Sequence, residues 1–243
     1  MSVATSTPTP SAWRSNLSSP PSGSEAPPLA KQERLGLLIL AGGRSVRMGR
    51  DKPGLPFPGP DDDPLVCRVA ASVASVAGPP TIAGPLDYGT GWHRVSDQAG
   101  LAGPVAGLIA GLAALPDPLV LVLGADLPFP SPRLARGLAD LAQRQPEAQA
   151  VVPERSGRLE PLFAVYRRDC LADLLASARQ LSRPERGPSL RRTLEQLRLR
   201  RVLEGEWRIW DPVGDSFVNC NTPDELAAAA ARVQAQPDQG GIR

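Results

Sequence analysis

A cluster of basic residues follows two glycines in the stretch LLILAGGRSVRMGRDKPGLPF, residues 37–57. Glycines let the backbone approach a ligand closely, and the N–H groups of such a turn can form a cradle for anions. Arg47 and Lys52 could then neutralise phosphate oxygens, arginine as a planar fork and lysine as a mobile point charge. The alternative is a tight surface turn with solvated cations. The string is neither a P-loop nor the dinucleotide pattern GxGxxG.

A single carboxylate follows the most apolar segment of the chain, in the stretch LVLVLGADLPFPSP, residues 119–132. The segment predicts a strand that delivers Asp126 to its carboxyl end. Mg²⁺ prefers oxygen ligands and usually binds through one or two carboxylates plus phosphates. Asp126 could instead cap the next helix, but Ser131 is better placed for that cap. The pattern therefore favours Asp126 as a magnesium ligand.

A second aspartate precedes a helix of small residues in the stretch SDQAGLAGPVAGLIAGL, residues 96–112. Asp97 follows a short predicted strand, and Pro104 suits the first turn of a helix. Gly107 and Gly111 recur at a spacing that permits close packing. Asp97 could accept hydrogen bonds from a purine edge or a ribose, or it could be a turn residue, and this stretch alone does not decide between them.

Composition excludes several other kinds of site. The charges nearly cancel, with 27 Lys and Arg against 25 Asp and Glu, and aromatic residues are only 4%, so neither nucleic acid nor a membrane surface is expected as a partner. Cys67, Cys170 and Cys220 are scattered and odd in number, which argues against a disulfide framework and suits a reducing cytoplasm. His93 is the only histidine, so a histidine-rich metal centre and a Ser–His or Cys–His nucleophile are excluded.

Short β-type runs alternate with longer helical stretches between residues 35 and 235. The pattern predicts strands at 35–40, 81–83, 94–96, 119–124, 150–152 and 162–166. It predicts helices at 65–77, 104–115, 132–144, near 168–178, near 188–197 and from Thr222-Pro223 onward. Such alternation predicts an α/β fold: a single three-layer, Rossmann-like domain with a mostly parallel sheet and helices on both faces. Ligands of these sheets bind beyond the carboxyl ends of the strands, which is where the loops described above fall.

The two ends of the chain differ from the body. Residues 1–33 are rich in Ser, Thr and Pro without a periodic apolar face, and residues 236–243 resemble them. We expect both segments to be disordered tails that flank one folded domain at 34–235. The first segment lacks the continuous apolar region of a secretory signal.

Five motifs in a fixed order resemble one known family. They are LAGGxSxRMGxDK at 40–52, Dx(5)GPVAGL at 97–108, GADLPF at 124–129, RLEPLFAVY at 158–166 and FVNCNTPDEL at 217–226. Together they resemble the molybdenum cofactor guanylyltransferases (MobA family) within the nucleotidyltransferase superfamily. The resemblance covers about residues 35 to 230.

The resemblance implies transfer of GMP from GTP to the phosphate of molybdenum-bearing molybdopterin, with release of pyrophosphate and with Mg²⁺ as cofactor. It implies a catalytic role for Arg47, Lys52 and Asp126. The residues that match the family's nucleotide-binding positions are Leu40, Ala41, Gly42, Gly43, Lys52, Asp97 and Asp126. By the same likeness, Asp126 is the metal ligand, and Asn219 and Asn221 lie near the metal or the pterin substrate. Other molybdenum cofactor biosynthesis proteins and apo-molybdoenzymes are the protein partners it suggests, in the cytoplasm.

Departures from the family pattern leave alternatives open. Ala125 stands where a Cys or Pro usually precedes the metal aspartate, and three acids occur in PGPDDDP, residues 58–64, where a loop tip is expected in preference to a second metal site. A cytidylyltransferase or a sugar-phosphate nucleotidyltransferase is the nearest rival, although cytidylyl-transferring relatives tend to carry an AAG-type loop in place of LAGG. A non-catalytic nucleotide-binding adaptor is a further alternative, which the presence of Lys52 and Asp126 opposes.

Overall fold

The computed structural model describes residues 35–42, 53–57, 63–86, 88–182 and 187–235. Every described residue belongs to one compact unit. The expected tails fall outside the described residues, so the boundaries expected for the domain stay predictions.

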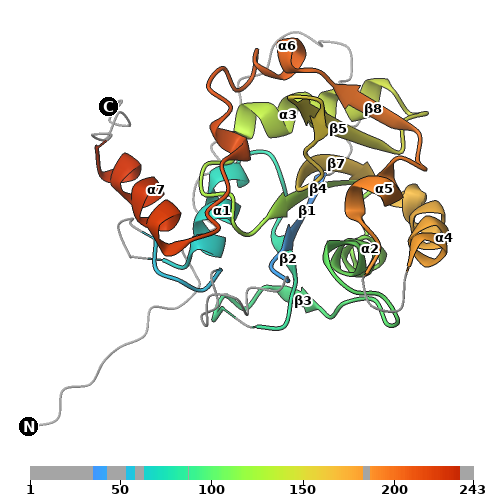
Figure 1. The fold of residues 1–243 in the computed structure, drawn as a ribbon, viewed down its shortest axis with the longest axis horizontal. Helices are drawn as coiled ribbons and strands as arrows, with labels where there is room; N and C mark the ends of the chain where they lie inside the picture. The colour runs from blue at the N-terminus through green and yellow to red at the C-terminus, as the bar shows by residue number, and fades with distance from the viewer. Residues whose placement is uncertain (1–34, 43–52, 58–62, 87, 183–186, 236–243) are drawn as a thin grey trace, which may run out of the picture. The chain divides into compact units, whose positions relative to one another are not determined.

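One eight-stranded sheet forms the centre of this unit (Figure 1). Its strands are β1 Leu35–Leu40, β2 Pro80–Ala83, β3 His93–Val95, β4 Leu119–Gly124, β5 Ala150–Arg155, β6 Arg158–Leu159, β7 Phe163–Arg167 and β8 Leu199–Val202. The helices are α1 Leu65–Val73, α2 Pro104–Ala114, α3 Pro132–Arg144, α4 Leu171–Leu181, α5 Leu190–Leu194, α6 Glu204–Trp207 and α7 Pro223–Ala235. Two 3₁₀ turns, η2 Arg168–Cys170 and η3 Asp215–Phe217, complete the described elements.

The sheet has a parallel side and an antiparallel side. The strand order is β3-β2-β1-β4-β7-β5-β6, and β8 pairs with β5. β1 pairs in parallel with both β2 and β4, and β2 pairs in parallel with β3. β7 is antiparallel to both β4 and β5, whereas β5 and β8 run in parallel. The fold class predicted from the alternation of elements is confirmed, and β7 and the two-residue β6 are the strands that run against the others.

Helices cover both faces of the sheet because the strands alternate their buried side chains. Leu37 and Ile39 of β1 face the cluster built with α1 and α3, whereas Leu38 and Leu40 face the cluster that contains α2, α4 and α5. All six residues of β4 are buried, as expected for a central strand with no polar face. Figure 1 shows α2, α4 and α5 on one side of the sheet and α1 and α3 on the other. No helix in the described ranges is both long and apolar enough to cross a bilayer.

Several predicted elements need correction at their ends. The helix predicted at 65–77 stops at Val73, because the chain then tightens into turns in which the Val76 N–H donates to the Val73 carbonyl at 2.9 Å. The helix predicted near 168–178 starts with η2 and continues as α4 to Leu181, and the helix predicted near 188–197 is only α5. The strand predicted at 150–152 continues to Arg155. Strands β6 and β8 and helix α6 were not predicted.

Candidate active site

The carboxyl ends of three neighbouring strands lie in one row. Leu40 is level with Ala83 of β2 on one side and with Gly124 of β4 on the other. Backbone pairing continues one residue further on both sides: the Ala41 N–H donates to the Ala83 carbonyl at 2.8 Å, and the Ala125 N–H donates to the Leu40 carbonyl at 3.1 Å. The loops that follow β1 and β4 are therefore fixed to the sheet before they reach any ligand.

Glycines bring the loop after β1, the loop after β3 and helix α2 close together. A methyl group added at Gly42 would lie 3.9 Å from Oδ1 of Asp97, and one added at Gly107 would lie 3.4 Å from the same oxygen. One added at Gly111 would overlap the buried side chain of Leu38. The close packing predicted for the glycines of α2 is confirmed, and it places the Asp97 carboxylate beside the backbone of the nucleotide-type loop.

Asp97 lies between these glycine-bearing segments. The residue as a whole is exposed, but partial burial of its carboxyl group raises the pKa of Asp97 above the ordinary aspartate value. The cause is desolvation, which disfavours the charged form. A carboxylate that is only partly hydrated can accept hydrogen bonds from a ligand at less cost than a fully hydrated one, because less water has to be displaced.

Asp126 stands two residues after the end of β4, and its side chain folds back over that end. A Cβ at position 124 would lie only 2.7 Å from Oδ1 of Asp126, so the glycine makes room for this carboxylate. The Gly124 N–H donates to the Leu162 carbonyl at 2.9 Å, which ties this turn to the start of β7. Asp126 is half-buried at the edge of the sheet. Ser131, as predicted, caps α3 instead: its hydroxyl accepts from the Leu134 N–H at 3.3 Å.

The two asparagines reach the same edge from far along the chain. The N–H of Cys220, between Asn219 and Asn221, donates to the Asp126 carbonyl at 3.0 Å. Helix α7 starts immediately afterwards: the Glu225 carboxylate accepts from the Thr222 N–H at 2.9 Å, and the Thr222 hydroxyl accepts from the Glu225 N–H at 3.1 Å. This reciprocal pair is a capping box, which explains the sequence TPDE. Both asparagine residues are exposed beside the Asp126 turn.

Part of the predicted site falls outside the described residues: Gly43, Arg47 and Lys52. The described chain resumes at Pro53, whose carbonyl accepts from the Val66 N–H at 3.1 Å in the first turn of α1. Most of the acidic stretch 58–64 also falls outside, and its predicted role as a loop tip stays a prediction. The structure thus brings together the described members of the predicted site: Leu40, Ala41, Gly42, Asp97, Asp126, Asn219 and Asn221.

The donors near Asp126 suit a metal that is completed by its substrate. No group of three or more His, Cys, Asp or Glu side chains that could hold a metal ion occurs among the described residues. A single half-buried carboxylate at a strand end fits Mg²⁺, which commonly takes one or two protein carboxylates and fills its other positions with phosphate oxygens and water. It does not fit zinc, whose structural and catalytic sites need at least three protein ligands.

Neither Cys67 nor Cys170 offers a reactive thiolate. All three cysteines lie in the described ranges. Burial raises the pKa of Cys170 to about 12 and also raises that of Cys67. Thiols with raised pKa values stay protonated near neutral pH and are poor nucleophiles.

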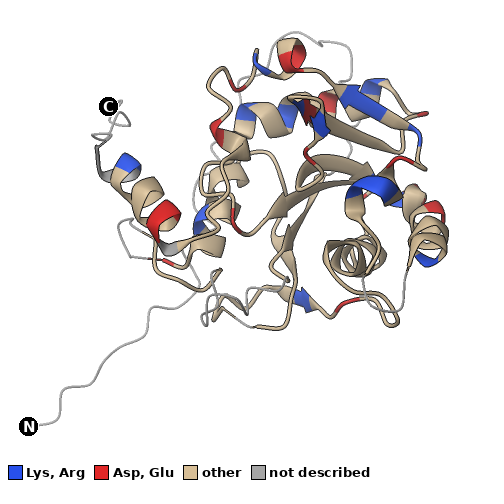
Figure 2. Ribbon diagram, viewed as in Figure 1, with Lys and Arg blue, Asp and Glu red and all other residues tan. Residues whose placement is uncertain are grey.

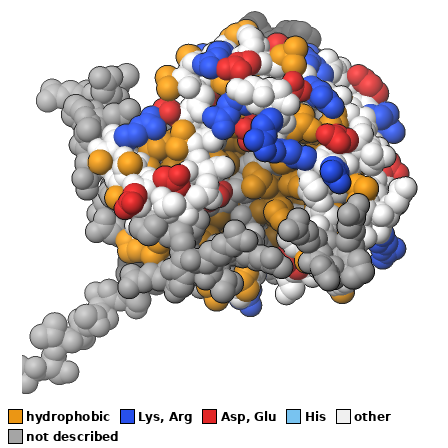
Figure 3. Space-filling model, in the orientation of Figure 1, with side chains coloured by type: hydrophobic (Ala, Val, Ile, Leu, Met, Phe, Trp, Pro, Cys, Tyr) orange, Lys and Arg blue, Asp and Glu red, His pale blue; other side chains and the backbone are white. Residues whose placement is uncertain are grey.

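A pocket of about 310 Å³ adjoins the Asp126 turn on the side of β7. The pocket is not predicted by the sequence pattern, although the motif RLEPLFAVY at 158–166 supplies four of its lining residues. Figure 3 shows a hollow with hydrophobic side chains inside it and basic side chains along its rim. Its lining residues include Leu127, Glu160, Leu162, Phe163, Arg191, Phe217 and Asn219.

Glycine-fixed loops at the carboxyl edge of a parallel sheet, with acidic side chains after two of the strands, define an α/β protein of the nucleotide-binding class. Comparison with known proteins narrows the class. Residues 37–202 match the family model described as "MobA-like NTP transferase domain". The chain therefore belongs to the MobA-like NTP transferase family, and it is a nucleotidyltransferase.

Individual relatives agree with this assignment. A probable molybdenum cofactor guanylyltransferase of Chloroflexus aggregans is 34% identical over 204 residues, which cover 80% of this chain and 92% of the relative. A molybdenum cofactor guanylyltransferase of Desulfosudis oleivorans is 32% identical, with 82% and 95% covered.

Solved structures share the fold. The crystal structure of molybdopterin-guanine dinucleotide biosynthesis protein A from Archaeoglobus fulgidus matches with a TM-score of 0.68 at 21% identity, and the match covers 83% of this chain and all of that one. A 2-C-methyl-D-erythritol 4-phosphate cytidylyltransferase of Thermus thermophilus matches with a TM-score of 0.57 at 22% identity, over 83% of this chain and 99% of that one.

Proposed function

We propose that the protein transfers GMP from GTP to the terminal phosphate of molybdenum-bearing molybdopterin, which forms the guanine dinucleotide cofactor and releases pyrophosphate. The relatives named above as molybdenum cofactor guanylyltransferases support this substrate pair. The observation that carries the proposal is the meeting of three separate segments, the loop after β1, the Asp126 turn and the Asn219–Asn221 segment, at one edge of the sheet.

The parallel side of the sheet is the proposed nucleotide side. The backbone of Leu40, Ala41 and Gly42 would approach the nucleoside, with Asp97 as an acceptor for its base or ribose. Arg47 and Lys52, outside the described residues, would neutralise the triphosphate and the departing pyrophosphate. Transfer of this kind requires in-line positioning and neutralisation of charge on phosphate oxygens more than covalent chemistry.

Asp126 would hold the Mg²⁺ ion that the family implies. When bound, the ion supplies positive charge that offsets the negative charge of the phosphate oxygens. The glycine at 124 leaves the carboxylate at the strand end, and the hydrogen bond from the Cys220 N–H to the Asp126 carbonyl fixes the turn that presents it. Asn219, exposed beside this turn and also part of the pocket wall, would orient the acceptor phosphate toward the nucleotide.

Guanine specificity and cellular context belong to the same proposal. The Leu40–Gly43 loop favours a guanylyl over a cytidylyl donor, and the family fold leaves both possible. The cytoplasm is the proposed location, where other molybdenum cofactor biosynthesis proteins and apo-molybdoenzymes would supply the acceptor and take the product.

The test is to incubate the protein with molybdenum cofactor, Mg²⁺ and each of the four nucleoside triphosphates, and to follow pyrophosphate release. We expect release with GTP and little with CTP, because buried polar groups left unmatched by the wrong base are costly. Equal release with both would overturn the guanine assignment. Binding of GTP without pyrophosphate release from any nucleotide would favour a non-catalytic adaptor.

A further inference from the structure

Glu160 places a carboxylate in the wall of the pocket beside Asp126. The residue lies directly after β6, and its backbone is held on both sides: its N–H donates to the Pro153 carbonyl at 2.8 Å, and its carbonyl accepts from the Phe163 N–H at 3.2 Å. The side chain is only 19% exposed. A carboxylate that is mostly removed from water requires a partner, and the pocket otherwise offers it apolar neighbours such as Leu162 and Phe163.

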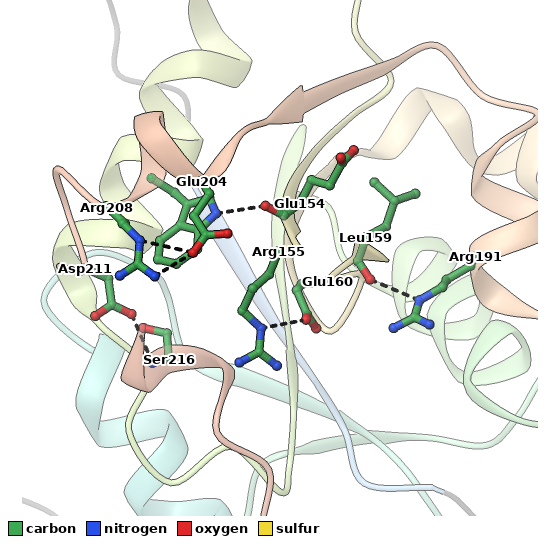
Figure 4. Close-up of polar contacts among 10 residues, drawn as sticks. Glu154, Arg155, Leu159, Glu160, Arg191, Glu204, Arg208, Asp211 and Ser216 are labelled. Carbon is green, nitrogen blue, oxygen red and sulfur yellow. Dashed lines mark hydrogen bonds and ion pairs between the residues drawn. The ribbon is translucent and has the colours of Figure 1, made fainter. Parts of the chain in front are cut away.

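Arg155 holds this carboxylate in place. Its Nε donates to Oε1 of Glu160 at 3.2 Å, and its guanidinium lies over the ring of Phe217, 5.7 Å from the centroid. Phe217 also lines the pocket. Figure 4 shows Arg155 and Arg191 on either side of Glu160. Because a carboxylate oxygen can accept more than one hydrogen bond, the ion pair orients Glu160 and still leaves it capacity for a ligand.

Few ligand groups match a fixed carboxylate between apolar walls. The best match is a planar ring edge that carries an amino group next to a ring N–H, since both donate in one plane to the two carboxylate oxygens. This 2-amino-4-oxo edge occurs in two molecules of the proposed reaction, the guanine of GTP and the pterin of the acceptor. The Glu160 carboxylate would accept hydrogen bonds from this edge, while Leu162 and Phe217 would pack against the faces of the ring.

The pocket also contains a basic side chain that suits an anion. Arg191 of α5 lines the pocket, and its Nε donates to the Leu159 carbonyl at 3.1 Å, which anchors the base of the guanidinium. Figure 2 shows further basic residues on α5 and on strands β5 and β8 around this region. A ligand with a donor-bearing ring edge and an acidic tail therefore fits the charges of the pocket better than a neutral ring alone.

The position of the pocket indicates which of the two molecules, GTP or the pterin acceptor, presents its ring edge to Glu160. Apart from Pro104 at the start of α2, the lining residues of the pocket lie on the β7 side of Asp126, whereas Leu40–Gly42 and Asp97 lie on the side of β1, β2 and β3. The guanine of the donor is assigned to the latter side. We propose that Glu160, oriented by Arg155, selects the acceptor by binding the 2-amino-4-oxo edge of its pterin. This inference rests on the function proposed above.

The test compares Glu160→Gln with Glu154→Gln. Glu154 is an equally shielded glutamate on the neighbouring strand β5, but it pairs with Arg201 and does not line the pocket. Fluorescence titration with 6-hydroxymethylpterin and, separately, with guanosine measures binding of each edge. We expect Glu160→Gln to weaken pterin binding about ten- to a hundredfold, since the amide replaces one acceptor by a donor. Glu154→Gln should bind pterin like the wild type.

Kinetics separate this inference from the proposed function. With GTP and molybdenum cofactor, Glu160→Gln should raise KM for the acceptor and leave KM for GTP unchanged. If a folded Glu160→Gln protein kept the wild-type KM for the acceptor and the wild-type affinity for pterin, the inference would be wrong. The proposed transferase function would not be affected by that result. If Glu160→Gln lost guanosine binding and kept pterin binding, the pocket would belong to the donor, and this result would also overturn the inference. Pterin binding that depends on Glu160, in a protein that releases no pyrophosphate, would support the pocket and contradict the proposed function.

A second variant covers the case in which Glu160→Gln does not fold. Arg155→Lys keeps a positive charge near Glu160 but removes the planar fork that lies over Phe217, so the carboxylate is less firmly oriented. We expect a smaller rise in acceptor KM, about two- to fivefold on the scale of one exposed ion pair. An unchanged acceptor KM in this variant would show that Arg155 does not orient the selecting group.

Discussion

The two sides of the sheet present ligands with different kinds of surface. On the parallel side, Gly84 and Gly107 allow backbone and small side chains to approach closely: a methyl group added at Gly84 would lie 3.1 Å from the carbonyl carbon of Ala41. On the β7 side, a pocket is built from long side chains such as Glu160 and Phe217.

The difference separates two modes of recognition. A surface made of backbone and glycine is fixed by the fold. It tolerates few substitutions at Gly84 and Gly107, because a carbon added there would lie only 3.1 or 3.2 Å from its nearest neighbour. A surface made of side chains can change its specificity by single substitutions while the fold stays the same. We infer that the nucleotide side is constrained by packing, whereas the pocket side can adapt to its acceptor. The turn that carries Asp126 lies between the two.

The largest expected effect concerns that turn. Asp126→Asn keeps the size of the side chain and removes the charge proposed to hold Mg²⁺, so turnover should fall by about a hundred- to a thousandfold, the loss typical of a removed electrostatic contact in a transition state. The melting temperature should change little. Steady-state rates are compared with those of Asp140→Asn on α3, which should react normally. Near-wild-type turnover in Asp126→Asn would place the metal elsewhere.

The next prediction concerns the frame of the pocket side. Asp211 is buried, and its carboxylate accepts from the Gly214 N–H at 3.1 Å and from the Ser216 N–H at 3.0 Å, as Figure 4 shows for Ser216. Asp211→Ala leaves the Ser216 N–H without an acceptor, whereas the Gly214 N–H keeps the backbone carbonyl of residue 211 at 3.2 Å, so the free energy of unfolding should fall by about 1–3 kcal/mol. Chemical denaturation measures the loss. Asp215→Ala breaks only the exposed pair with Arg232 and should cost less than about 1 kcal/mol.

A third prediction tests the packing of the parallel side. Gly111→Ala places a carbon against the buried side chain of Leu38, and overpacking of this kind should cost about 1–2 kcal/mol. Gly205→Ala on α6 meets nothing within 4 Å and should be neutral or slightly stabilising. If both variants melted at the wild-type temperature, the parallel side would have more room than the glycines indicate.

The smallest expected effect concerns pH. Partial burial raises the pKa of Asp97, so the folded state binds its proton more tightly than the unfolded state does. This preference favours folding at low pH, and it is lost as pH rises from the ordinary value of 3.8 through the raised pKa. Asp97→Asn removes that dependence. The variant should match the wild type in stability at pH 3 and slightly exceed it at pH 7, measured by denaturant unfolding at both pH values; the reverse order would mean that the carboxylate has a stabilising partner.

Much of the fold could be predicted because the local sequence patterns of strands and helix ends agreed with the burial of the same residues in the structure. Leu119–Gly124 is apolar throughout, and its predicted limits match β4, while Ser131 and Pro132 gave the start of α3. Strand β8 was missed because LRRV carries two arginines and has no apolar run; its strand character comes from parallel pairing with β5. The short β6 likewise depends on a hairpin turn at Ser156 and Gly157, both with positive φ.

The candidate site also contains residues that the sequence predicts and residues that it does not. Loops directly after predicted strands gave Asp97 and Asp126, because the ends of parallel strands meet at one edge. The pocket could not be predicted, since Glu160 and Arg191 are charged residues without special spacing. They come together only through the antiparallel insertion of β7 and the packing of α5.

The hydrogen bond between the Cys220 N–H and the Asp126 carbonyl has a consequence for how the protein is made. Contacts between segments far apart in sequence form late, because a long loop must close first. The ribosome has to synthesise the chain past residue 221 before Asn219 and Asn221 can join the turn that carries Asp126. A nascent chain that stops short of this point could assemble the glycine-lined strand ends but not the complete edge. Catalytic competence should therefore arise only after this segment has been synthesised.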